Sequence, residues 1–212
     1  MNFTHILKKY ELQAARADDA FEKMQESYGT YVKCLPGCSD CCHAIFGLFL
    51  VEAVYLQIHF SQLERRKRRP AILRADKMER NFEKLEKKFH KQNSCTQLSN
   101  ELIARERIRC PLLDDTQKCI LYHYRPITCR VYGIPTVVQG KAHVCGISGF
   151  KKGEPYPAFD LGEVQRELYK LTRELLDGNA EKASLLISVS KAIKTPVEAI
   201  ISGRPVESGA SC

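Results

Sequence analysis

The segment KCLPGCSDCCHAIFG, residues 33–47, places four cysteines within nine positions of the chain. A second set of four cysteines follows much later, between residues 110 and 145. Together these eight residues are Cys34, Cys38, Cys41, Cys42, Cys110, Cys119, Cys129 and Cys145. Four thiolates are the ligand set of tetrahedral zinc sites and of cubane iron–sulfur clusters. We therefore predict that the eight cysteines bind metal and that the fold is built around them.

The distribution of these thiols among metal ions stays open at the level of sequence. Adjacent residues of an extended chain point in opposite directions, so Cys41 and Cys42 either serve different metals or leave one thiol spare. Each sequence group of four can form one site, or the early and late groups can interleave. The other two cysteines, Cys95 and Cys212, lie apart from both groups, and we interpret them as small apolar residues.

The length and the apolar patterning predict a cytoplasmic protein without membrane association. A chain of 212 residues can form one domain with a substantial core. Its first residues are charged and periodic, unlike a secretory signal. The longest apolar run, AIFGLFLVEAVYL, is interrupted by Glu52 and is too short to span a bilayer. Because cytosolic thiols are kept reduced, clustered cysteines there favour metal binding over disulfides.

The formal net charge of +8 suggests, at first sight, a basic surface that binds phosphates. If eight cysteines bind metal as thiolates, however, the charge of the protein falls to about zero before the metal is counted. The basic excess then balances a buried anionic centre. We therefore disfavour nucleic acid as a partner without excluding it.

The N-terminal region predicts a long helix over residues 2–31, because apolar or small side chains recur in steps of three and four. These side chains are Phe3, Leu7, Tyr10, Ala14, Ala17, Phe21, Met24, Tyr28 and Tyr31. Such a seam packs either in the core or against a protein partner. This helix is accordingly our candidate for a protein interaction.

Three further helices are expected between the two cysteine groups. The first spans residues 49–64 and ends near the basic run at residues 65–69. Pro70 is then expected to separate this helix from the next one. Apolar residues at helical spacing predict that second helix over residues 71–92. A shorter helix is expected at residues 97–107.

Residues 109–158 change in character, because Pro, Gly, Cys, Tyr and β-branched residues replace the helical pattern. This composition predicts irregular structure with two short strands, at residues 118–122 and 134–138.

Helices resume at Asp160, which with Glu163 predicts an N-terminal cap, and they continue to about Asp177. Another helix is expected at residues 180–193. The sequence at residues 195–198, Thr-Pro-Val-Glu, then predicts the start of a last short helix.

We therefore predict a single, mainly α domain in which helices enclose an irregular cysteine-rich metal centre with at most a few short strands. Its expected parts are a long helix at 1–32, a first cysteine block at 33–48, helices at 49–108, a second cysteine block at 109–158 and C-terminal helices at 159–212.

Two alternative chemistries involve the first block alone. The spacing C-x3-C-x2-C at Cys34, Cys38 and Cys41 resembles the three-thiolate loop of radical S-adenosylmethionine enzymes. Those families usually have an aromatic residue where this chain has Asp40, and they alternate strands and helices, which this sequence does not. The C-x2-C pair would suit a thioredoxin-like redox site, but that site needs a βαβ setting.

A broader resemblance uses both blocks. The stretches CLPGCSDCC and CPLLDDTQKCILYHYRPITCRVYG closely resemble the CxxCxxCC family of zinc- or iron-chelating domains, a cysteine-cluster family of bacteria and archaea, over residues 34–145. The resemblance implies metal ligation by the four cysteines of the first block and by Cys110, Cys119 and Cys129 of the second. Cys145 fits a later cysteine that many members have. A related block in flagellin lysine methylases implies an iron–sulfur cluster.

Arginines and tyrosines of the second block are candidates for the surroundings of the centre. Arg125 and Arg130 flank Cys129, where they would hydrogen-bond cluster sulfides, anchor an anionic substrate, or pair with Asp114 or Asp115. The tyrosines expected to pack around the centre and restrict water are Tyr122, Tyr124 and Tyr132.

Histidines and carboxylates near the cysteines are expected to support the site without binding the metal. With enough thiols available, His43, His123 and His143 are interpreted as neighbours of ligands or as surface residues. The carboxylates Glu52, Asp40 and Asp114 are interpreted as hydrogen-bond partners.

Three functions follow from these observations. The preferred one is an iron–sulfur protein, holding one or two clusters that we expect to be 4Fe-4S, with a redox or accessory-enzyme role. The second is a zinc-stabilised interaction or nucleic-acid-binding module, and the third is a methyltransferase-like enzyme. Iron–sulfur is preferred because the spacings do not match paired C-x2-C zinc ribbons and because adjacent cysteines are easier to place around a polynuclear centre. The resemblance to flagellin methylases points the same way.

Overall fold

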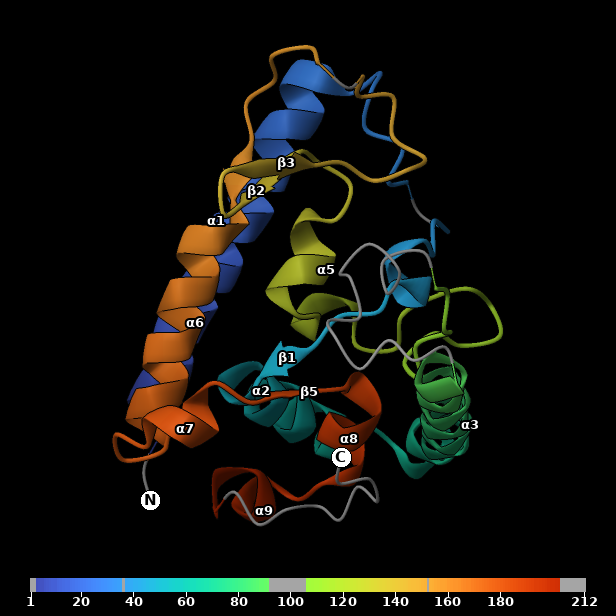
Figure 1. Cartoon of the computed structure of the whole chain (residues 1–212), viewed down its shortest axis with the longest axis vertical. Helices are drawn as coiled ribbons and strands as arrows, with labels where there is room; N and C mark the ends of the chain where they lie inside the picture. Colours follow the sequence, from blue (N-terminus) through green and yellow to red (C-terminus); the bar gives the residue numbers. More distant parts are fainter. Residues whose placement is uncertain (1–2, 36, 92–105, 152, 203–212) are drawn as a thin grey trace. The chain divides into compact units, whose positions relative to one another are not determined.

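The computed structural model describes residues 3–35, 37–91, 106–151 and 153–202, and most of them lie in helices (Figure 1). The helices are α1 (Thr4–Tyr28), α2 (Leu50–Gln62), α3 (Arg65–Lys91), α5 (Ile127–Val131), α6 (Leu161–Leu175), α7 (Ala180–Ala183), α8 (Val189–Lys194) and α9 (Val197–Ser202), with 3-10 turns η1 (Cys41–His43) and η2 (Tyr122–Tyr124). The strands are β1 (Leu48–Phe49), β2 (Thr136–Val138), β3 (Lys141–His143), β4 (Phe159–Asp160) and β5 (Leu186–Ile187). The mainly helical class that the sequence predicts is confirmed.

The chain forms two compact units, each assembled from three separate segments. The first unit comprises Met1–Cys38, Phe49–Glu52 and Tyr124–Leu185. The second comprises Ser39–Leu48, Ala53–His123 and Leu186–Cys212. Both cysteine blocks are therefore divided between the units.

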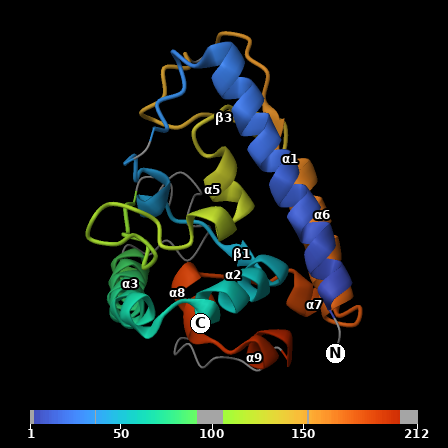
Figure 2. The same cartoon turned by 180° about the vertical axis from the view of Figure 1, so that it is seen from behind.

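The first unit is organised by α1, which packs against α5 and α6 (Figure 2). The residues of α1 that are buried are Ile6, Tyr10, Ala14, Ala17 and Met24. They follow the helical period that the sequence predicts, with Ile6 in place of Leu7. The apolar seam of α1 is thus buried within its own unit.

A small sheet in the first unit has the order β3-β2-β4. Strand β2 pairs antiparallel with β3 and parallel with β4, with Thr136 opposite His143 on one side and Phe159 on the other. Gln139 and Gly140 connect β2 and β3, and both have positive φ, at 51° and 75°. A two-residue hairpin needs this left-handed conformation, which glycine adopts without strain.

Helix α6 begins and ends as its sequence predicts. The side chain of Asp160 accepts a hydrogen bond from the backbone N–H of Glu163 at 2.7 Å, which caps the first turn. At the other end Gly178 has a φ of 89°, and its N–H donates to the carbonyl of Arg173 at 2.8 Å. The N–H of Gly178 thus gives a backbone carbonyl in the last turn of α6 a hydrogen-bond donor.

In the second unit α3 packs against α8. Ala71, Ala75 and Met78 of α3 are buried. At the edge of this contact the ammonium of Lys194 binds the carboxylates of Asp76 and Glu79 at 2.7 and 2.6 Å. Helices α3 and α8 are therefore joined by an apolar contact, and the ion pairs of Lys194 lie at its edge.

Three predictions of secondary structure are wrong. Helix α3 begins at Arg65 and contains Pro70. The carbonyl of Glu64 accepts the first hydrogen bonds of the helix, from the N–H groups of Lys67 and Arg68, and the one N–H that proline lacks does not end a helix with strong apolar periodicity. Residues 118–122 form a single bridge between Leu113 and Cys119, followed by η2. Residues 180–193 divide into α7, β5 and α8.

Other sequence predictions hold or lie outside the described residues. The N-terminal helix, α2, β2 and α9 lie close to the predicted ranges. The helix expected at 97–107 falls almost entirely outside the described residues, as do Cys95 and Cys212. Among the helices that the structure describes, none is both long and apolar enough to cross a membrane.

Candidate metal centre

Four of the eight cysteines belong to the second unit: Cys41, Cys42, Cys110 and Cys119. The first two lie on η1, where their sulfurs are 4.0 Å apart. The N–H of Cys110 donates to the carbonyl of Cys42 at 2.7 Å, and the N–H of Ile108 donates to the carbonyl of His43 at 3.1 Å. This backbone pairing brings the later segment against the first cysteine block.

A tight turn connects Cys110 to Cys119. Residues Leu113 and Cys119 form a β-bridge, and the N–H of Ile120 donates to the carbonyl of Leu112 at 2.9 Å. The turn therefore folds the chain back on itself and returns Cys119 to the neighbourhood of Cys110.

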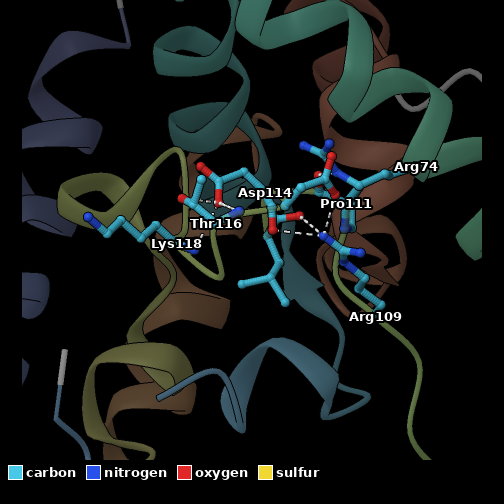
Figure 3. Close-up of polar contacts among 8 residues, drawn as sticks. Arg74, Arg109, Pro111, Asp114, Thr116 and Lys118 are labelled. Atoms are coloured by element: carbon cyan, nitrogen blue, oxygen red, sulfur yellow. Dashed lines mark hydrogen bonds and ion pairs between the residues drawn. The ribbon is translucent and has the colours of Figure 1, made fainter. Parts of the chain in front are cut away.

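Polar side chains hold this turn in place (Figure 3). The carboxylate of Asp114 accepts hydrogen bonds from the N–H of Thr116 and of Lys118, both at 2.9 Å. One guanidinium nitrogen of Arg109 donates to the carbonyls of Leu113 and Asp114 at 3.0 and 2.7 Å. Asp114 is thus a hydrogen-bond partner, as the sequence predicts.

Two arginines outside the predicted set also support the turn. The side chain of Arg74 on α3 donates to the carbonyl of Pro111 at 2.8 Å, and Arg109 pairs with Asp115 at 3.0 Å (Figure 3). Arg107 contacts both the carbonyl and the carboxylate of Asp40 in the first cysteine block. Arginine, with several donors in a fixed fork, can join such loop carbonyls.

The four thiols of the second unit interact electrostatically. Burial raises the pKa of Cys110 to about 12, and charge on Cys119 or Cys41 would raise it further. The pKa of Cys42 is also raised, first by its hydrogen bond with Cys41, then by burial and by the neighbouring Cys110 and Cys119. Without a cation, each thiolate in this group would oppose the next.

The other four cysteines, Cys34, Cys38, Cys129 and Cys145, belong to the first unit. Cys34 packs against Gly133, where a Cβ would lie 2.6 Å from the Cβ of Cys34. Gly133 lies just beyond α5, the helix that carries Cys129. The N–H of Gly149 donates to the carbonyl of Tyr31 at 2.7 Å. Residues 31–34 are therefore in contact with the surroundings of both later cysteines.

The structure therefore assigns the thiols to units in two sets, each with two cysteines from either block. Within residues 3–35, 37–91, 106–151 and 153–202, no three or more His, Cys, Asp or Glu side chains are arranged closely enough to hold a metal ion. The donor chemistry suits a thiophilic metal, since soft sulfur ligands select zinc or iron–sulfur clusters. A closed ligand set requires the thiols of a group to move toward one another.

Pairing with Asp114 or Asp115 was one of three alternatives expected for Arg125 and Arg130, and the ion pairs of these arginines involve Asp18 instead. Both arginines face Asp18 on α1: Arg130 forms a close ion pair with it, and Arg125 lies 3.7 Å away. The exposed fraction of the Arg130 side chain is 6%. These arginines therefore attach α5 to α1. The role of Asp18 could not be predicted from the sequence, because Asp18 is one of many charged residues on an amphipathic helix.

The tyrosines and histidines also differ in their surroundings. Tyr122 and Tyr124 are 57% and 38% exposed, so the prediction that they pack around the centre and restrict water is wrong. Both belong to the 3-10 turn η2, which contains no buried residue. The imidazole Nδ1 of His43 hydrogen-bonds the carbonyl of Ser39 at 2.9 Å, in agreement with a supporting role, and His143 is exposed on β3.

Glu52 is a buried hydrogen-bond acceptor, as predicted. Its carboxylate accepts from the N–H of Phe49 at 3.2 Å and from the N–H of Ile127 at 3.1 Å. Burial raises the pKa of Glu52 to about 7, although these two N–H groups and the charge of Arg130 act in the opposite direction. Glu52 thus connects the start of α2 to the start of α5.

This carboxyl group predicts a pH dependence of stability. The folded protein retains a proton that the unfolded chain, with a pKa near 4.5, releases, so the free energy of unfolding should fall as the pH rises from about 4.5 to about 7. The fall attributable to Glu52 is up to about 3 kcal/mol. Urea unfolding of Glu52→Gln, compared with the wild type at pH 5 and pH 7.5, should show this fall in the wild type only. Parallel pH profiles for the two proteins would contradict the assignment.

Comparison of this chain with protein-family models, with curated proteins and with solved structures found no match.

Proposed function

We propose that this is a metal-binding cysteine-cluster protein, with iron–sulfur as the preferred cofactor and a redox or accessory-enzyme role. The observation that carries the proposal is the gathering of Cys41, Cys42, Cys110 and Cys119 in one unit, through backbone pairing of segments almost seventy residues apart. Buried thiols that raise one another's pKa are costly to ionise alone, and a bound cation removes that cost.

The cysteine thiolates suit an iron–sulfur cluster chemically, because soft sulfur ligands select such clusters. Cys41, Cys42, Cys110 and Cys119 would hold one centre, and the four thiols of the first unit would hold a second. Such a cluster supplies one-electron redox chemistry when bound. The protein's own contribution is a loop fixed by Arg74, Arg109 and Asp114, whose backbone would orient the ligands and limit access of water.

The resemblance of both cysteine blocks to the CxxCxxCC family also supports this proposal. The adjacent cysteines and the absence of paired C-x2-C spacing favour iron–sulfur over zinc. A radical-enzyme or thioredoxin-like role has less support, because the strands within the described residues have only two or three residues each. A reducing, cytoplasmic environment is part of the proposal, since the centre needs eight thiols rather than disulfides.

Analysis of metal and acid-labile sulfide tests the proposal. Protein purified without oxygen should be brown and should contain iron and sulfide in comparable amounts. Colourless protein with stoichiometric zinc would overturn the iron–sulfur assignment and leave a zinc-stabilised module. Protein that contains neither metal after reconstitution with each would overturn metal binding itself.

A further inference from the structure

The positive charge of the chain is concentrated on a single helix. By sequence, α3 contains twelve basic and four acidic residues, and this excess equals the formal net charge of +8 for the whole chain. The charge lies on a helix of 27 residues within the second unit.

The charged residues of α3 are segregated into rows. One row is exposed and cationic: Arg66, Arg69, Lys77, Arg80, Lys84 and Lys87. We call it the cationic row; its members and Leu73 recur in steps of three or four, which places them on one face. The acidic residues Asp76, Glu79, Glu83 and Glu86 form a separate row, and the buried residues Ala71, Ala75 and Met78 form a third. The cationic row thus faces solvent while the apolar row packs in the unit.

The cationic row is unfavourable for the isolated helix. Like charges three or four positions apart, such as Arg80 and Lys84, destabilise a helix by about 0.2–0.5 kcal/mol per pair. The first turn of α3 contains no acidic residue, so its cations also lie at the positive end of the helix dipole. Lys194 binds Asp76 and Glu79, which reduces the negative charge available to balance the row. Glu83, three positions after Arg80 and four before Lys87, offsets part of this repulsion within the helix, and a polyanion would relieve the remainder.

The length and the composition of the cationic row favour one class of polyanion, double-stranded DNA. From Arg66 to Lys87 it extends about 32 Å, close to one turn of B-form DNA, at about 34 Å. The row contains no aromatic residue on which single-stranded bases would stack. Its one apolar member is Leu73, which is too little to bury in a membrane interface. The major groove of B-DNA is wide enough to admit a helix between its two phosphate backbones, whereas the major groove of A-form RNA is deep and narrow.

We propose that the cationic row of α3 binds the phosphate backbone of double-stranded DNA without reading its sequence. Six cations along one helix can neutralise several phosphates at once and release their counterions. Leu73 lies in the middle of the row. Arg69 can contact phosphate with two donors, whereas the guanidinium of Arg66 pairs with Glu64 at 2.5 Å and would have to exchange that carboxylate for a phosphate. This activity does not depend on the nature of the metal centre.

Fluorescence anisotropy with a labelled duplex of random sequence tests the proposal on the full-length, metal-loaded protein. With about five phosphates neutralised, affinity should fall by about 500-fold between 50 and 200 mM salt. The double variant Arg80→Gln/Lys84→Gln should reduce the slope of log K against log salt by about 2. The matched control Lys23→Gln/Lys170→Gln removes two exposed cations from α1 and α6 and should leave the slope unchanged.

Three outcomes would overturn the proposal. They are an absence of binding at 50 mM salt, equal losses in the double variant and its control, and tighter binding to single-stranded DNA, duplex RNA or anionic phosphatidylserine vesicles than to duplex DNA. Circular dichroism of each variant establishes that it is folded, so that a loss of binding reports on charge. Retained metal content in the double variant separates this result from a failure of the metal centre.

Discussion

Replacing Cys110 with serine is expected to remove the metal bound by the second unit and to lower the free energy of unfolding by several kcal/mol. A serine hydroxyl stays protonated at neutral pH and is a harder donor than a thiolate, so the ligand set would be incomplete. Binding of structural zinc to small domains contributes about 10–16 kcal/mol, which indicates the scale of the loss. Metal analysis and thermal unfolding measure the two effects.

The matched control is Cys95→Ser, which alters a cysteine outside both groups. This variant should retain its full metal content and sulfide. Full metal content in Cys110→Ser would contradict the role of Cys110 as a ligand.

The companion variant Cys129→Ser distinguishes one centre from two. If each unit holds its own centre, Cys110→Ser and Cys129→Ser should each lose about half of the metal and the double variant should lose all of it. If all eight thiols serve one centre, either single variant should lose nearly all of it.

Replacing Arg130 with methionine is expected to lower the free energy of unfolding by about 2 kcal/mol. Arg130 is almost fully buried, pairs with Asp18 and donates to the carbonyl of Arg125 at 2.9 Å. Methionine retains much of the side-chain volume but leaves Asp18 without this cation and removes a positive charge near Glu52. Asp18 is 39% exposed, so water can solvate its remaining charge, and the main cost is the loss of the hydrogen bonds that the buried guanidinium donates. Urea unfolding at pH 7 measures the change.

Arg166→Met provides the comparison, since Arg166 is an exposed arginine on α6. Its substitution should change the free energy of unfolding by less than about 0.5 kcal/mol. Equal effects of the two substitutions would show that the contact of α5 with α1 does not depend on the Arg130 ion pair.

Local signals in the sequence predict much of the helical framework. The apolar period of α1 and the Asp160 cap of α6 act within a few residues, and both are found where expected. Pro70 was misleading because a single lost hydrogen bond is a smaller effect than the packing of the apolar row of α3 against α8. The contact between α3 and α8 joins distant segments, so local helix propensity cannot predict it.

The surroundings of the cysteines were less predictable, because they depend on contacts between distant segments. The spacing of the cysteines predicts eight candidate ligands, and that stays a prediction, whereas the division of these thiols between two units could not be predicted from spacing. Asp18 and Arg74 lie on helices whose many charges look alike in sequence, and only folding selects the partners of Arg130 and Pro111. The exposure of Tyr122 likewise follows from a 3-10 turn that replaced an expected strand.

The close approach of Gly133 to Cys34 has a consequence for how natural variants of this protein should be interpreted. Any side chain at position 133 would have to displace the Cβ of Cys34, which lies 2.6 Å from the required position, as well as the ring of Phe21, at 3.2 Å. A substitution at Gly133 would therefore behave as a defect of the first cysteine segment, although it lies about a hundred residues away and changes no thiol.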